Sequence, residues 1–123
     1  MTKAELVSKI SVNLGLEKNE VLATIENFME EVKNSDPDVI ILMPCGFDTD
    51  RTVSEYDSIL SNNSAWNSLK AVKDNQIYAV DANSFFSKPS IRTIDGLEIL
   101  AKIIHPDKFK NLIVPTNSFA KLS

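Results

Sequence analysis

The segment "PDVIILMPCGFDTDRT", residues 37–52, is the most informative about the fold. Residues 39–43 are five apolar side chains in a row, and they end abruptly at Pro44, Cys45 and Gly46. An apolar run of this length is typical of a strand that is buried on both faces of a parallel sheet. In α/β proteins ligands bind beyond the carboxyl ends of such strands, so the turn that follows is either a ligand-binding loop or a simple connector.

Downstream, the pattern continues as helix, strand and helix. Asp48 or Thr49 can cap a helix that runs to about Leu60, and residues 65–69 indicate one short helical turn. The turn "KDNQ" leads into a second apolar strand at residues 77–80, and a strand, helix and strand in this order predict parallel pairing. A third helix is expected from about Ser90, with a continuous apolar face made of Ile91, Ile94, Leu97, Leu100, Ala101 and Ile104.

The tail from Lys110 onward is expected to be a surface segment. Two parallel strands alone do not make a stable sheet. The sheet is therefore completed by the tail or by a partner, or part of a larger lobe is absent from this sequence.

Upstream, the first 34 residues predict an α-hairpin. Thr2 and Glu5 have the spacing of a capping box, and Gly15 is a C-terminal stop for a helix with Leu6, Ile10 and Leu14 on one side. The second helix is expected from about residue 18 to 33, with an apolar stripe of Val21, Leu22, Ile25, Phe28, Met29 and Val32. Ser35, Asp36 and Pro37 mark the seam between this hairpin and the α/β part.

Composition narrows the class of protein. The 123 residues carry a net charge of -4, which disfavours broad binding to a phosphate backbone. Cys45 is the only cysteine and His105 the only histidine, so neither an intrachain disulfide nor a cysteine zinc site is expected. No signal-peptide pattern occurs at the start, and no run approaches the roughly 18 apolar residues of a membrane span, so the chain as it stands is expected in the cytoplasm.

Two segments carry a family resemblance. They are "DPDVIILMPCGFDTDRT" at residues 36–52 and "LKAVKDNQIYAVDANSFFSKPSIRTIDGLEILAKIIHPDKF" at residues 69–109, with Trp66 between them. Together they resemble the C-terminal lobe of the extracytoplasmic substrate-binding proteins of ABC importers for cobalamin and iron-siderophores. The resemblance implies a partial Rossmann-like parallel-sheet lobe (βαβα) over residues 35–123, a corrinoid or iron-chelate ligand, and an ABC transporter permease as partner.

The start of the chain resembles something else. "MTKAELVSKISVNLGLEKNEVLATIENFMEEVK" is similar to the first two helices of the HU family of histone-like, dimeric DNA-binding proteins. This resemblance covers residues 1–34 and implies a homodimer through the hairpin. The alternative use of its residues Phe28, Met29 and Val32, and the simpler one, is to cover the exposed face of the sheet within the same chain. The HU sheet and its basic arms have no counterpart here, so nucleic acid is not an expected partner. The whole sequence has the character of a fusion.

The candidate site consists of the two loops after the strands, residues 44–48 and 81–87. With the resemblance, the ligand-binding residues are expected to be Cys45, Gly46, Phe47, Trp66, Asn83, Phe85, Phe86 and Arg92. The aromatic rings have a second interpretation as core residues, Trp66 as the anchor of a short turn, and Arg92 as a cap. Glu55 is the candidate for docking to basic residues of the transporter.

No enzyme activity, cofactor or metal site is predicted, and cobalamin is expected as a transported ligand. Cys45 is interpreted as a loop residue and His105 as a helix cap, while acids such as Asp48 and Asp50 suit the start of a helix. The sequence thus favours a substrate-binding module of an ABC importer. The alternatives are an HU-like DNA-associated or dimerising protein, and a small hydrolase that uses Cys45 and His105.

Overall fold

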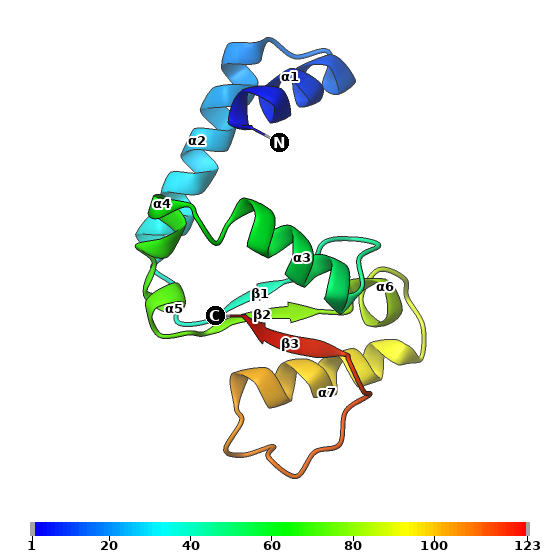
Figure 1. Cartoon of the computed structure of the whole chain (residues 1–123). Coiled ribbons are helices and arrows are strands. Elements are labelled where there is room, and N and C mark those ends of the chain that lie inside the picture. Colours follow the sequence, from blue (N-terminus) through cyan, green and yellow to red (C-terminus); the bar gives the residue numbers. More distant parts are fainter. Residues whose placement is uncertain (1, 123) are drawn as a thin grey trace. The chain divides into compact units, whose positions relative to one another are not determined.

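The computed structural model describes residues 2–122, apart from the side chain of Met29. The chain divides into two units, one ending at Pro37 and the other beginning at Asp38 (Figure 1). The first is a helical hairpin, and the second is a mixed α/β unit.

The hairpin begins with α1, Lys3–Leu14. The predicted capping box is confirmed, because the Glu5 N–H donates to Thr2 Oγ1 at 3.2 Å and the Thr2 N–H donates to Glu5 Oε2 at 2.9 Å. Gly15 ends the helix in the left-handed region with φ 65°, as its position predicts.

The second helix, α2, spans Lys18–Ser35 and is two residues longer than expected. Val7 and Val21 are the buried residues between the helices, and Lys3 forms an ion pair with Glu26 at 2.8 Å. That ion pair joins the first turn of α1 to the middle of α2. The last turns of α2 therefore extend past the N-terminal end of α1.

The predicted hairpin stripes are only partly right. Phe28 is 65% exposed, and Leu14 is exposed at the turn. Leu6, Ile10, Leu22, Ile25 and Val32 are half-buried. The predicted position of Met29 in the stripe lies outside the described residues.

The α/β unit is built on three strands in the order β1-β2-β3, with β1 at Ile40–Leu42, β2 at Ile77–Val80 and β3 at Phe119–Leu122. The parallel pairing of β1 with β2 confirms the prediction, in a register that runs from Ile40 opposite Ile77 to Leu42 opposite Ala79.

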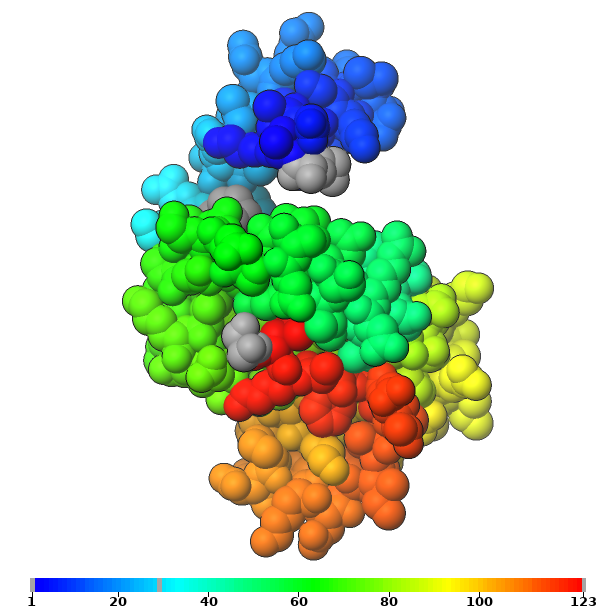
Figure 2. Space-filling view, viewed as in Figure 1, coloured from blue at the N-terminus to red at the C-terminus, as the bar shows by residue number. Residues whose placement is uncertain are grey.

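The expectation of an all-parallel sheet is wrong, and the tail, expected as a surface segment, is partly built into the sheet. The tail forms β3, which pairs antiparallel with β2 and makes the sheet mixed. Because this strand supplies the second neighbour of β2, the tail is the part of the chain that completes the sheet to three strands. In the space-filling view β3, in red, lies at the surface of the unit (Figure 2).

Helices lie on both faces of this sheet (Figure 1). Asp48 caps α3 by accepting a hydrogen bond from the Arg51 N–H at 2.8 Å, as the sequence predicts. Two short turns follow where the sequence predicts one. The helices of this unit are α3 at Thr49–Ile59, α4 at Ser64–Asn67, α5 at Lys70–Lys73, α6 at Ala82–Phe85 and α7 at Arg92–Ile104.

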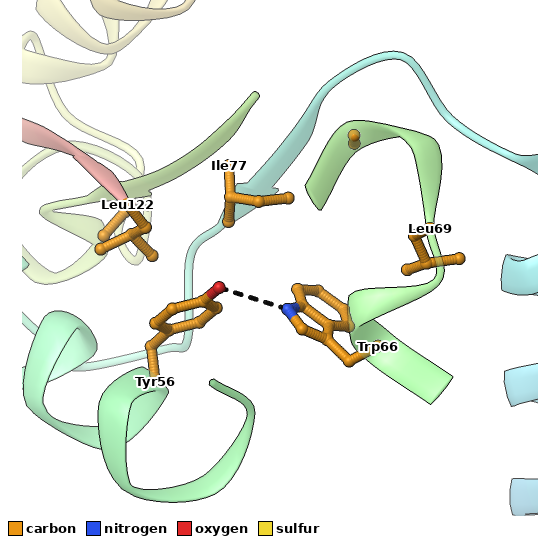
Figure 3. Close-up of a cluster of buried hydrophobic side chains, with 7 residues drawn as sticks. Tyr56, Trp66, Leu69, Ile77 and Leu122 are labelled. Atoms are coloured by element: carbon orange, nitrogen blue, oxygen red, sulfur yellow. Dashed lines mark hydrogen bonds between the residues drawn. The ribbon is translucent and has the colours of Figure 1, made fainter. Parts of the chain in front are cut away.

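The face of the sheet toward α3 buries an aromatic cluster (Figure 3). Tyr56 and Trp66 pack edge to face with ring centroids 6.3 Å apart, and the indole Nε1–H donates to the Tyr56 hydroxyl at 3.4 Å. Val53 and Leu60 of the same chain segment also pack against this cluster. The remaining buried members are Leu69, Ala71, Ile77, Ala79 and Leu122.

The opposite face of the sheet packs against α7, whose predicted inner face is wrong. The buried residues of this helix are Gly96, Ile99 and Ile103, and four of the residues expected to face the core, Ile91, Ile94, Leu97 and Ile104, are exposed. The reason is that α7 is apolar on two opposite sides, so the apolar periodicity of the sequence is compatible with packing through either side. Gly96 selects the packed side, because a Cβ there would lie only 3.0 Å from the Phe86 ring and 3.1 Å from the Phe85 carbonyl oxygen.

Candidate functional site

The two predicted loops lie together at one edge of the sheet. Because β1 and β2 are parallel, their carboxyl ends meet at the same edge, and residues 44–48 and 81–87 start there. The Gly46 N–H donates to Ser87 Oγ at 3.2 Å, and the Asn83 N–H donates to the Phe47 carbonyl oxygen at 3.0 Å. These two hydrogen bonds join the loops into one continuous surface.

The first loop is a tight turn centred on Cys45 and Gly46. The Phe47 N–H donates to the Pro44 carbonyl oxygen at 3.1 Å, and Gly46 has φ 78°. A positive φ at the third position of a turn is a conformation that prefers glycine there. Cys45 lies at the tip as an exposed free thiol.

Phe47 is partly covered by a cation from the first turn of α3. The Arg51 guanidinium lies 3.8 Å from the centroid of the Phe47 ring, which is close enough for a cation–π interaction. Arg51 is not among the residues that the sequence predicts for this site. The one signal for this contact in the sequence is the spacing of four residues between Phe47 and Arg51. That spacing predicts a contact between side chains only within one helix, and Phe47 lies before the capping residue Asp48.

The aromatic residues of the second loop point inward. Phe85 is 8% exposed and belongs to the core cluster on the α7 side, and the half-buried Phe86 packs its ring against Gly96. The cause is α6, a single helical turn capped by Asp81 through a hydrogen bond from the Ser84 N–H. This turn buries Phe85 and leaves Asn83 exposed. We therefore assign both rings to the core.

Trp66 also belongs to the core. Its side chain is 7% exposed and its only polar atom, the indole N–H, donates to Tyr56 (Figure 3). A stacking ring needs an open face, and this indole is packed in the cluster on the α3 side. The second interpretation of Trp66, as the residue that anchors a short turn, agrees with the observed packing.

Arg92 and Glu55 are exposed, as a role in binding requires. Arg92 is the first residue of α7, and Glu55 lies in α3. His105 follows the last residue of α7, and a helix of 13 residues is about 20 Å long. His105 is thus at the far end of α7 from Arg92 and from the loop that precedes this helix, so a Cys45–His105 pair has no support from the fold.

A third segment reaches the same edge and was not predicted. The Thr49 hydroxyl donates to the Asn117 carbonyl oxygen at 2.7 Å, and the Asp81 N–H donates to the Ser118 carbonyl oxygen at 2.9 Å. The residues just before β3 thereby tie the first turn of α3 to the end of β2. Ser118 is 1% exposed, and its Oγ has no hydrogen-bond partner among the described residues.

Residues 2–122 contain neither a metal-binding cluster nor a membrane-spanning helix. No group of three or more His, Cys, Asp or Glu side chains there is arranged to hold a metal ion. In that same part of the chain, no helix combines the length and the apolar character needed to cross a bilayer.

The comparison with known proteins finds no relative of this chain. No protein-family model, no curated protein and no solved structure matches this chain. The function proposed below therefore rests on the geometry of the loops and on the resemblance carried by the sequence.

Proposed function

We propose that the α/β unit is a ligand-binding module of the kind found as the C-terminal lobe of ABC-importer substrate-binding proteins, with a Rossmann-like arrangement of its parallel strands. The observation that supports it best is the joined pair of loops at the carboxyl ends of β1 and β2. Two independent hydrogen bonds, from Gly46 and from Asn83, hold these loops side by side. Ligands of open α/β sheets bind at this edge.

The exposed chemistry of the loops suits a large, flat ligand with polar side groups. Arg51 and Asn83 are exposed and offer a cation and an amide, and the half-buried Phe47 offers the part of its ring that the Arg51 guanidinium leaves uncovered. Arg92 adds a second exposed cation near the start of α7. A corrinoid or an iron chelate has the size and the carboxyl or amide groups that such a surface would contact without covalent chemistry.

Transport would require a second contact surface for the permease. Glu55 is exposed in α3, whose inner side faces the sheet. We propose Glu55 for docking to a basic side chain of the transporter, a contact at which charge affects the rate of association more than affinity.

The test is a titration of the ¹⁵N-labelled chain with cyanocobalamin, followed by NMR. We expect the amide signals of Gly46, Phe47 and Asn83 to shift together. The expected Kd is weaker than about 100 µM, because the pair of loops contacts the ligand on one side only. Parallel titration with a ferric siderophore distinguishes the two ligand classes.

Phe47→Ala is the decisive variant, and we expect it to weaken binding about tenfold through loss of the ring contact. Phe28→Ala is the matched control, because it removes the same side chain from an exposed position in the hairpin. Absence of shifts in both loops, or equal effects of the two variants, would contradict the proposal.

A second candidate function concerns the hairpin. Val12, Leu14, Leu16 and Phe28 are exposed apolar side chains on this short unit, which favours an HU-like role in self-association. DNA binding has less support, because residues 1–37 contain four lysines against six glutamates and Asp36. A gel shift at low salt tests the DNA role, and retarded DNA would contradict this ranking.

A further inference from the structure

Helix α7 has an apolar stripe that faces away from the sheet. Its inner side, Gly96, Ile99 and Ile103, is buried against β2 and its neighbours. On the other side Ile94 is 59% exposed, Leu97 64% and Ile104 48%, with the half-buried Ala101 between them. Burial against the sheet therefore accounts for only one of the two apolar sides of this helix.

The spacing of the outer stripe identifies the kind of partner that fits it. Residues 94, 97, 101 and 104 are three, four and three positions apart, which is the a/d spacing of helices that pack side by side. We define these four residues as the outer stripe. A second helix, rather than a strand edge or a small molecule, is the element whose side chains interlock with this pattern.

The outer stripe is also complementary to itself. Its spacing reads the same from either end, so a second copy turned antiparallel about a two-fold axis places Ile94 opposite Ile104 and Leu97 opposite Ala101. The large leucine thus meets the small alanine twice, which is the size matching that close packing requires. We propose that the outer stripe of α7 is the contact between two copies of this chain, paired antiparallel.

The flanks of the stripe set the strength of this contact. Leu100 lies beside the stripe on one flank and adds apolar area, while the two Glu98 carboxylates come near each other at the two-fold axis on the other flank. The outer stripe with Ile91 exposes on the order of 400 Å² per copy, whereas a stable interface buries about 800 Å² per partner. The expected dimer is therefore weak and depends on concentration.

The first test is sedimentation equilibrium of the full chain from ~20 µM to ~1 mM. We expect the mass to rise toward that of a dimer, and Leu97→Glu to weaken association roughly a hundredfold, since the charge would enter the contact twice. Leu97 is exposed, so the variant should keep its fold, which the far-UV circular dichroism spectrum checks. Phe28→Glu is the matched control in the hairpin.

The outcomes separate the two surfaces. Loss of the dimer in Leu97→Glu but not in Phe28→Glu supports the proposal. A chain that stays monomeric at ~1 mM, or a dimer that is lost only in Phe28→Glu, overturns it. The result is independent of whether the loops bind a ligand.

The second test concerns orientation. In a Cys45→Ser background, a mixture of the Leu97→Cys and Ala101→Cys variants should form a mixed disulfide dimer under mild oxidation, because antiparallel pairing puts these positions opposite each other. Glu98→Gln should strengthen association a few-fold by removing the carboxylate repulsion. Preferential Leu97→Cys homodimers, or weaker association in Glu98→Gln, would overturn the antiparallel arrangement.

Discussion

At Gly96 a single hydrogen atom in place of a methyl group determines how closely α7 approaches α6. The Phe86 ring and the Phe85 carbonyl oxygen would be 3.0 and 3.1 Å from a Cβ at this position. The ring can rotate away, but the carbonyl belongs to the backbone of α6 and can move only with the helix.

We expect Gly96→Ala to lower the free energy of unfolding by about 1–3 kcal/mol through this overpacking, although alanine is the better helix former by about 1 kcal/mol. Urea unfolding followed by Trp66 fluorescence measures the change. Leu97→Ala, an exposed substitution in the same helix, should stay within about 0.5 kcal/mol at low micromolar protein. Equal or higher stability of Gly96→Ala would show that the contact relaxes without cost.

Asp38 and Lys70 form an exposed ion pair between the segment before β1 and the start of α5. The hydrogen bond from Lys70 Nζ, and then its positive charge, hold the pKa of the Asp38 carboxyl below its ordinary value of 3.8. Since the folded pKa is lower than the unfolded one, the pair stabilises the fold above the unfolded pKa. This contribution is lost as the pH falls through the folded pKa.

A ¹³C NMR titration of the carboxyl groups should therefore show Asp38 titrating below 3.8 in the native chain. Lys70→Met should return its pKa toward that value, while Lys73→Met, one turn further on, should leave it unchanged. An unaltered Asp38 titration in Lys70→Met would mean that the pair is not maintained in solution.

Aromatic residues show what the sequence cannot decide at this scale. Phe47, Trp66 and Phe85 all lie close to the predicted strands, and each fits both a ligand surface and a core. Only the direction of the backbone separates them: the α6 turn buries Phe85, and the α3–α4 connection brings Trp66 against Tyr56. The direction of the backbone depends on tertiary contacts, which a local sequence pattern does not contain.

Among the elements, β2 was predicted to the residue and β3 was missed. Ile77–Val80 is a run of four buried residues bounded by a turn, so its period and limits are visible in the sequence. Phe119–Leu122 follows "PTNS", includes the exposed Lys121, and is recognisable as a strand only through its pairing with β2. The same holds for α7. The sequence predicts the extent of this helix but not which of its sides packs against the sheet.

The importance of β3 is open to measurement at Leu122. This side chain is 5% exposed within the cluster on the α3 side, so Leu122→Ala should cost about 2–4 kcal/mol of unfolding free energy. Leu97→Ala removes the same atoms from a position that is 64% exposed and, at low micromolar protein, should cost less than about 0.5 kcal/mol. Similar costs at both positions would contradict the burial of β3.

At the scale of the whole molecule, the chain consists of two units with unequal cores. The hairpin buries only Val7 and Val21 among its described side chains, whereas the α/β unit has a buried cluster on each face of its sheet. A pair of helices with so small a core is marginal on its own.

We expect two unfolding transitions rather than one. Trp66 is the only tryptophan, so its fluorescence reports the α/β unit alone, while far-UV circular dichroism reports the helices of both units. On heating, the dichroism signal should begin to fall before the fluorescence changes. Coincident curves would show that the two units unfold together.

The long interval between β2 and β3 has a consequence during synthesis. About forty residues separate the two strands, so at ordinary elongation rates the ribosome takes about 2 to 8 s to deliver the partner of β2. Throughout that time the nascent chain carries an apolar strand with one edge unpaired. We expect the emerging polypeptide to depend on ribosome-associated chaperones until β3 leaves the exit tunnel.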